Sequence, residues 1–196
     1  MSGQIPFAFD AAPKLTRADF IVAPANAEAV AFLARWPDWP VAAVALFGPP
    51  GSGKSHLAGT LPAAKIIEDV GTMPATRKRD EAIFSALERA TRDAPVILTG
   101  REHPSTWETA LPDLASRFSA LLAFPLWAPD DALLAALARK LFADRQLAVP
   151  DAVIETMLRR LDRAPGAIRA FVAQADAKAL AEKRAVNAAL ILEMMR

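Results

Sequence analysis

The sequence contains no cysteine. This absence excludes disulfides, thiolate metal sites and thiol nucleophiles, and nothing points to an oxidising compartment. No apolar run reaches the roughly 18 residues that a membrane-spanning helix needs. Residues 1–7 (MSGQIPF) also lack the charged-then-apolar pattern of a secretory signal. We therefore expect a cytoplasmic protein that is neither exported nor embedded in a membrane.

An excess of charge of one sign is missing as well. The 23 Lys and Arg residues against 22 Asp and Glu leave a formal net charge of +1, which gives no global field to attract nucleic acid. Histidine occurs twice, as His56 and His103, without forming a pair or ligand cluster, so we interpret both mainly as structural. Hydrophobic residues make up 53% of the 196 residues, enough for one sizeable core with a small satellite domain.

Patterns typical of strands alternate with patterns typical of helices over residues 26–128. Short apolar runs that end at Gly or Pro indicate buried strands, and apolar residues at helical spacing indicate helices. This alternation predicts an α/β fold class, with a parallel sheet covered by helices on both faces. The expected strands span residues 43–47, 65–70, 95–99 and 120–126, and the expected helices span 26–36, with Asn26 as a plausible N-cap, and 80–92.

The sequence patterns on either side of this domain differ from those within it. Pro6, Pro13 and Pro24 predict an extended arm over residues 1–25. Beyond Pro129 the pattern is helical throughout, which predicts a small all-helical C-terminal subdomain over residues 129–196. Its expected helices span residues 130–146, 151–161, 166–183 and 187–195.

A phosphate-binding motif follows the first expected strand. The string GPPGSGKS satisfies the G-x-x-x-x-G-K-[ST] pattern in the strand, loop, helix context that it requires. Its backbone N–H groups and the following helix start would surround phosphate oxygens, Lys54 would neutralise the β- and γ-phosphates, and the Ser55 hydroxyl would bind Mg²⁺. The expected cofactors are therefore ADP or ATP with Mg²⁺. The motif consists of Gly48, Pro49, Pro50, Gly51, Ser52, Gly53, Lys54 and Ser55.

Two adjacent acids end the second expected strand. A P-loop needs a carboxylate near a strand end to hold Mg²⁺ and to polarise the attacking water. We assign the metal side to Glu68 and the water side to Asp69. The alternative is a strand that ends in two solvated carboxylates.

Three further features stay open on the residues alone. Arg117 and Arg169 could each reach a γ-phosphate, or each could be an ordinary surface salt-bridge residue. The N-terminal string QIPFAF, residues 4–9, could dock as an extended peptide in a groove of another protein, through Gln4 and apolar side chains, or pack on its own domain.

These strings together resemble the AAA+ proteins related to the bacterial replication initiator DnaA, and within them the short Hda-type homologues. The similar strings are FIVAPAN (20–26) before the first helix, GPPGSGKS as Walker A, Glu68 and Asp69 as Walker B, VILTG (96–100) as the sensor 1 strand, Trp107, LPDLASR (111–117) as the arginine-finger motif and GAIR (166–169) as sensor 2. The resemblance extends over nearly the whole chain.

The resemblance implies roles for several of these residues. Arg117 would be an arginine finger directed at a partner's nucleotide, and Arg169 would sense the nucleotide bound in cis. Apart from the resemblance, His56 is also a candidate nucleotide contact because it directly follows the P-loop. Gln4, Ile5, Phe7 and Phe9 would bind the DNA sliding clamp. The implied activity is stimulation of ATP hydrolysis on a DnaA-type initiator in trans, with self-association as in related modules. No helix-turn-helix segment follows the helical region, so we expect no direct sequence-specific DNA binding.

The chain also departs from the pattern. Glu68 stands where an aspartate is usual, and Arg101 stands where a small polar or acidic residue is frequent, which implies weak or absent intrinsic hydrolysis. Only residues 55–67 separate Lys54 from Glu68. Either the family's second strand is deleted, which we prefer, or residues 65–70 are that strand and Walker B is lost. An autonomous ATPase or small-molecule kinase, and a nucleotide-independent adaptor with a vestigial P-loop, remain alternative hypotheses.

Overall fold

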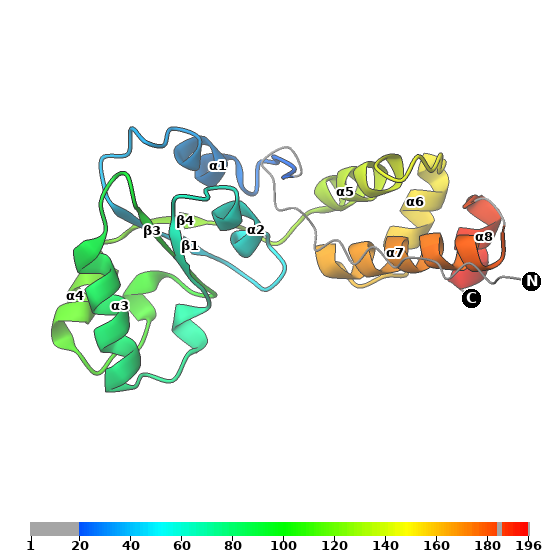
Figure 1. The fold of residues 1–196 in the computed structure, drawn as a ribbon. Helices are drawn as coiled ribbons and strands as arrows, with labels where there is room; N and C mark the ends of the chain where they lie inside the picture. The colour runs from blue at the N-terminus through cyan, green and yellow to red at the C-terminus, as the bar shows by residue number, and fades with distance from the viewer. Residues whose placement is uncertain (1–19, 184–185, 196) are drawn as a thin grey trace, which may run out of the picture.

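Two lobes make up the part of the chain that this computed structural model describes, residues 20–183 and 186–195 (Figure 1). The first lobe holds a sheet with helices on both faces, and the second lobe is made of helices. The proposed clamp-binding residues 4–9 lie outside the described residues.

The sheet of the first lobe has four strands in the order β2-β3-β1-β4, and every pairing is parallel. Its two central strands are almost completely buried, as expected for a sheet covered on both faces. The α/β fold class predicted from the sequence is confirmed. The strands are β1 (Ala43–Phe47), β2 (Lys65–Ile67), β3 (Val96–Gly100) and β4 (Leu122–Pro125).

Successive side chains of each strand supply two separate cores, because they point to opposite faces of the sheet. Val44 and Leu46 pack with helices α1 and α2, whereas Ala45 belongs to the core under α3 and α4. Figure 1 shows these helix pairs on opposite sides of the sheet. The helices are α1 (Ala27–Leu33), α2 (Lys54–Gly59), α3 (Arg77–Arg89) and α4 (Pro112–Ala120), with two 3₁₀ turns, η2 (Val70–Thr72) and η3 (Pro104–Thr106).

Three local expectations need correction. Strand β2 ends at Ile67 rather than at residue 70, because Asp69 adopts a left-handed conformation (φ 50°) and a 3₁₀ turn follows. Helix α4 was not predicted, although Pro112 in its first turn is a start signal. Asn26 occupies the predicted N-cap position of α1, but its side chain makes no capping hydrogen bond. Its side chain instead accepts from Ala23 N (2.9 Å) and donates to Ile21 O (3.0 Å), which holds the lead-in segment.

A buried charge pair connects α3 to the segment before α4. The Asp80 carboxylate is fully buried and accepts from Arg79 (2.6 Å), the Thr109 hydroxyl (2.8 Å) and the Ala110 N–H (2.6 Å). Burial acts to raise the pKa of Asp80, but these three donors outweigh it and hold the pKa below its ordinary value of 3.8.

We expect Asp80→Asn to lower the free energy of unfolding by about 3 kcal/mol, because it removes one partner of a buried ion pair and leaves Arg79 without its counter-charge. A lowered carboxyl pKa stabilises the fold above pH 3.8 and loses that contribution as the pH falls through the folded-state value. Urea denaturation at pH 7 and at acid pH measures both effects. The variant should lack this acid-dependent loss, and a variant with wild-type stability at pH 7 would contradict the assignment.

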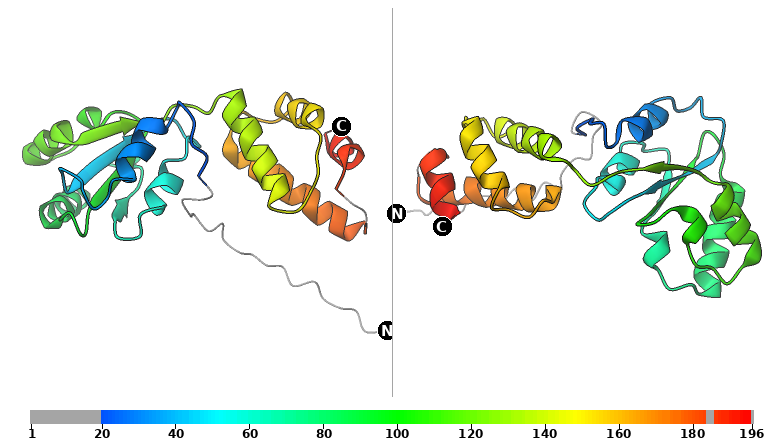
Figure 2. Two further views of the ribbon diagram at one scale, coloured as in Figure 1. Left: turned by 90° about the horizontal axis from the view of Figure 1, so that it is seen from above. Right: turned by 180° about the vertical axis from the view of Figure 1, so that it is seen from behind.

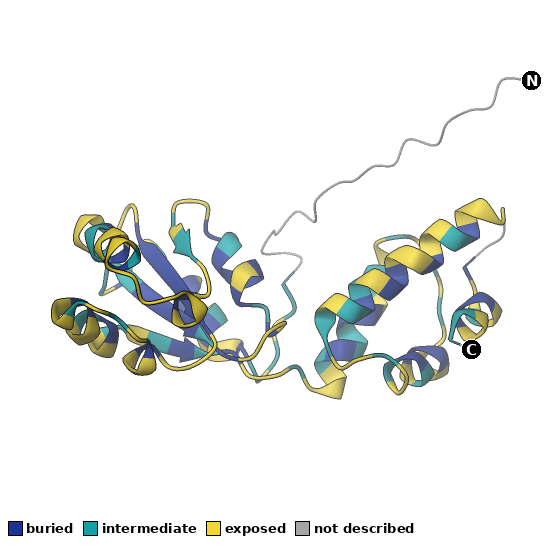
Figure 3. Cartoon of the chain, turned by 90° about the horizontal axis from the view of Figure 1, so that it is seen from below, coloured by how far each residue is buried: buried dark blue, intermediate teal, exposed yellow. Residues whose placement is uncertain are grey.

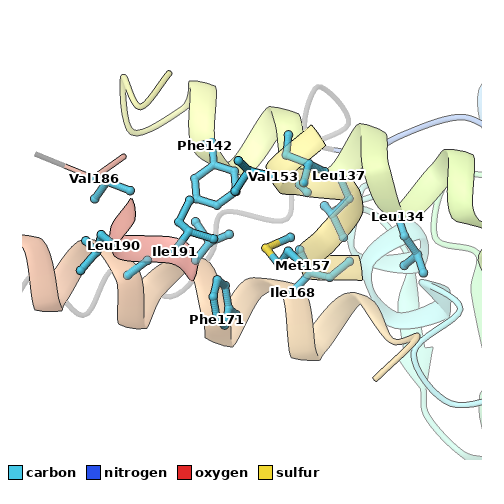
Figure 4. Close-up of a cluster of buried hydrophobic side chains, with 14 of the residues drawn as sticks. Leu134, Leu137, Phe142, Val153, Met157, Ile168, Phe171, Val186, Leu190 and Ile191 are labelled. Carbon is cyan, nitrogen blue, oxygen red and sulfur yellow. The ribbon is translucent and has the colours of Figure 1, made fainter. Parts of the chain in front are cut away.

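The second lobe is a four-helix subdomain with its own core. Figure 4 shows side chains from all four helices meeting there, among them Leu137, Phe142, Met157 and Ile168. Buried faces alternate with exposed ones along each helix (Figure 3). No described helix combines the length and apolar character needed to cross a bilayer. The helices are α5 (Asp131–Ala143), α6 (Asp151–Leu158), α7 (Pro165–Ala181) and α8 (Ala188–Met194).

Candidate functional site

The predicted phosphate-binding loop lies at the carboxyl ends of the parallel strands, where open α/β sheets hold their ligands. It leaves β1 at Gly48, whose N–H donates to Gly100 O at the end of β3 (3.1 Å). Gly48 has φ 145°, and a Cβ there would lie 2.0 Å from Leu126 O, so only glycine fits. The loop is therefore anchored between the ends of two neighbouring strands.

Lys54 turns its side chain back into this loop. Its Nζ donates to Gly48 O (2.7 Å) and Pro49 O (2.9 Å), and the residue is only 6% exposed. Burial lowers the pKa of Lys54, Arg101 acts in the same direction, and Asp69 opposes both. The ammonium group is thus held inside the loop at the position from which a P-loop lysine reaches phosphate.

A cavity of about 380 Å³ opens on the loop, a volume within the usual range of small-ligand sites. It brings together P-loop residues that the sequence singled out, among them Lys54 and Ser55, with His56, Asp69 and Arg169. It draws on four parts of the chain, namely the P-loop with the start of α2, the end of β2, the end of β3, and the start of α7. The lining residues are Pro50, Gly51, Gly53, Lys54, Ser55, His56, Asp69, Arg101, Pro165, Gly166 and Arg169.

The two candidate acids are placed differently. Asp69 lines the cavity, and its N–H donates to the Thr99 hydroxyl of β3 (3.0 Å), which fixes the backbone beside Lys54. Glu68 is exposed and is not among the described residues that line the cavity. The metal role assigned to Glu68 stays a prediction, and Asp69 is the acid that the fold brings to the loop.

The helical lobe closes one side of the cavity. Arg169 Nη2 lies 3.4 Å from His56 Nδ1, and a Cβ at Gly51 would lie 3.5 Å from Pro165 Cδ. The Phe20 ring meets His56 edge-on at 5.2 Å between centroids. Sequence reasoning took the lead-in for an arm outside the domain, but Phe20 packs against the P-loop helix.

Arg117 lies elsewhere. It is not among the lining residues, and α4, which carries it, lies at the end of the first lobe away from the helical lobe (Figures 1 and 2). Its guanidinium stacks over the Phe84 ring at 4.2 Å and pairs with Glu88 at 3.3 Å, with 40% of the side chain exposed. The residue is therefore held in a fixed orientation on a surface distant from this chain's own P-loop.

The donor set fits a magnesium ion bound together with phosphates. Mg²⁺ takes oxygen ligands and is usually held by one or two protein groups plus substrate phosphates. Ser55 and Asp69 line the same cavity and supply a hydroxyl and a carboxylate. The described residues contain no cluster of three or more His, Asp or Glu that would form an all-protein metal cage.

Arg101 is the lining residue whose role sequence reasoning missed. It was noted only as a departure at the end of β3, yet it lines the cavity with Lys54 and Asp69. The available signal was topological, since residues that follow adjacent parallel strands meet at one edge of the sheet.

Comparison with known proteins shows which solved structures share this fold. No protein-family model and no curated protein matches the sequence. Among solved structures, domain III of the Thermotoga maritima replication initiation protein DnaA superposes with a TM-score of 0.76 at 16% identity, covering 93% of this chain and 97% of that domain. AMPPCP-bound DnaA from Aquifex aeolicus gives 0.69 at 15%, covering 84% of this chain and 65% of that chain. The Thermotoga maritima RuvB branch migration motor gives 0.66 at 18%, covering 93% and 71%.

The fold is that of an AAA+ module. Identities this low establish the architecture alone, so the activities of those proteins do not transfer with it. The AAA+ architecture accounts for both lobes, the parallel sheet with its P-loop and the helical subdomain that follows. This chain spans less than two thirds of the DnaA chain from Aquifex aeolicus.

Proposed function

We propose that this chain is a nucleotide-binding AAA+ regulator that binds ADP or ATP in the cavity at its P-loop. One observation carries the proposal: Lys54 is buried inside a complete P-loop and faces the same cavity as Ser55, Asp69 and the lobe-bridging Arg169. The AMPPCP-bound state of the DnaA structure with the same fold supports it.

In this proposal, each residue at the cavity has a role that follows from its position and charge. Backbone N–H groups of the loop and Lys54 bind the β- and γ-phosphates. Arg169 reaches the nucleotide from the helical lobe and links the two lobes through it. Ser55 and Asp69 hold Mg²⁺, which when bound neutralises phosphate charge. Strand β2 pairs with β3, and Asp69, which follows β2, lines the same cavity as Lys54. This arrangement supports the interpretation that the family's second strand is deleted.

The regulatory part of the proposal concerns a partner. Arg117 is held on an exposed surface away from this chain's own P-loop, which suits a guanidinium that acts on another protein's nucleotide. We propose a DnaA-type initiator as that partner, with the sliding clamp bound through residues 4–9. Self-association through the same surface is part of this proposal.

Deleting residues 4–9 should abolish capture by immobilised clamp without changing the melting temperature, and unchanged capture would remove the clamp from the proposal.

Calorimetric titration with ADP and with ATP, followed by a turnover assay on the same preparation, tests the nucleotide-binding function. Micromolar or tighter binding with negligible turnover is the expected result. Rapid turnover by the purified chain would favour an autonomous ATPase. If neither nucleotide binds at millimolar concentration, the P-loop is vestigial and the chain is an adaptor.

A further inference from the structure

Arg101 emerges from the sheet between two anchored neighbours. On one side, Gly100 O accepts from Gly48 N in the P-loop (3.1 Å). On the other, Glu102 O accepts from the Trp107 indole N–H (2.9 Å), and Trp107 is itself buried. The backbone that carries Arg101 is thereby fixed relative to the P-loop, and its side chain lines the nucleotide cavity.

The cavity holds more positive than negative charge. Lys54, Arg101 and Arg169 line it together with a single carboxylate, that of Asp69. The other two cations are already engaged, since Lys54 donates to loop carbonyls and Arg169 lies against His56. Arg101 makes no hydrogen bond, ion pair or ring contact with any described residue, and its side chain is exposed to the cavity.

The guanidinium of Arg101, which has no partner among the described residues, favours the binding of an anion. It is permanently charged and offers two parallel N–H donors that match a phosphate. Its proximity to Lys54 is unfavourable until an anion lies between them, and Arg101 already contributes to the lowered pKa of Lys54. A terminal phosphate group would relieve that repulsion and would give Arg101 its missing partner.

We propose that Arg101 binds the terminal phosphate of the nucleotide and supplies charge neutralisation that Mg²⁺ would otherwise provide, so that nucleotide affinity in this protein depends little on Mg²⁺. This inference rests on the proposed nucleotide binding and goes beyond it. Ser55 and Asp69 can still hold the ion, but the three cations keep the phosphates bound without it.

The test compares ADP and ATP affinities of the full chain in excess Mg²⁺ and in EDTA, by isothermal calorimetry. The variants are Arg101→Ala, Arg101→Lys and, as a matched control, Arg92→Ala. Arg92 is also exposed but precedes β3, at the opposite end of the strand from Arg101, and does not line the cavity. Because Arg101 has no partner to lose, the melting temperature of Arg101→Ala without nucleotide should equal that of the wild type.

We expect the wild type and Arg92→Ala to lose less than about 3-fold in affinity in EDTA. Arg101→Ala should lose about 10-fold or more in EDTA and markedly less in Mg²⁺, as for loss of a charge-assisted hydrogen bond. Arg101→Lys keeps the positive charge but lacks the planar pair of N–H donors. Its loss of affinity in EDTA should therefore lie between those of the wild type and Arg101→Ala. A wild type that binds in Mg²⁺ but loses affinity in EDTA as strongly as Arg101→Ala overturns this inference alone. A wild type that binds in neither condition overturns the proposed nucleotide function as well.

Discussion

Replacing Lys54 with alanine should weaken ADP and ATP binding by about 100-fold or more. The ammonium group is the one cation buried within the loop among the described residues, and its contacts with phosphate are charge-assisted hydrogen bonds of about 1.5–3 kcal/mol each. Calorimetric titration of the variant beside the wild type measures the loss.

Two further variants test whether the loss comes from the charged group of Lys54, which also donates to Gly48 O and Pro49 O. Lys54→Met keeps most of the side-chain volume but removes the charge, and it should lose affinity to the same degree as Lys54→Ala. Lys78→Ala removes an exposed lysine of α3 and should bind like the wild type. If Lys54→Met retained wild-type affinity, neither the charge of Lys54 nor its hydrogen bonds to the loop would contribute to nucleotide binding.

Replacing Arg117 with alanine should reduce the stimulated ATP hydrolysis of a DnaA-type partner by about 10³-fold, the scale of an arginine finger delivered in trans. The measurement is phosphate release by ATP-loaded initiator in the presence of this chain and clamp-loaded DNA. Binding of ADP to the variant itself should not change, because Arg117 does not line its own cavity.

The surroundings of Arg117 supply the controls. Arg117→Lys keeps a positive charge without the planar fork and should recover only a small part of the activity. Glu88→Gln weakens the ion pair at 3.3 Å but leaves the guanidinium stacked on Phe84, so its effect should be far smaller. Equal stimulation by the wild type and Arg117→Ala would show that this arginine is an ordinary surface residue and would remove the trans role from the proposed function.

Local sequence patterns predicted much of the first lobe because its strands are defined locally. The apolar run of residues 43–47 is β1 without a shift at either end, since Gly48 and Pro49 end the strand directly. The predicted strand extended beyond β2 because Val70 was included after the two acids, whereas Asp69 adopts a left-handed conformation and its N–H donates to Thr99, far along the chain. Periodicity carries no information on such a contact.

The candidate site likewise has a part that the sequence predicted and a part that only the tertiary structure decided. The spacing of Lys54 and Ser55 within GPPGSGKS is a property of one contiguous loop, so the sequence alone predicted a phosphate-binding loop and determined the α/β class. Only the tertiary structure decided which acid reaches that loop, because Glu68 and Asp69 are adjacent and the turn after β2 brings Asp69 alone into the cavity. Likewise, the inclusion of Arg101 and Arg169 depends on how β3 and the helical lobe pack against the P-loop. Local preferences act over a few residues, whereas a binding site forms from segments that meet only when the sheet and the second lobe are assembled.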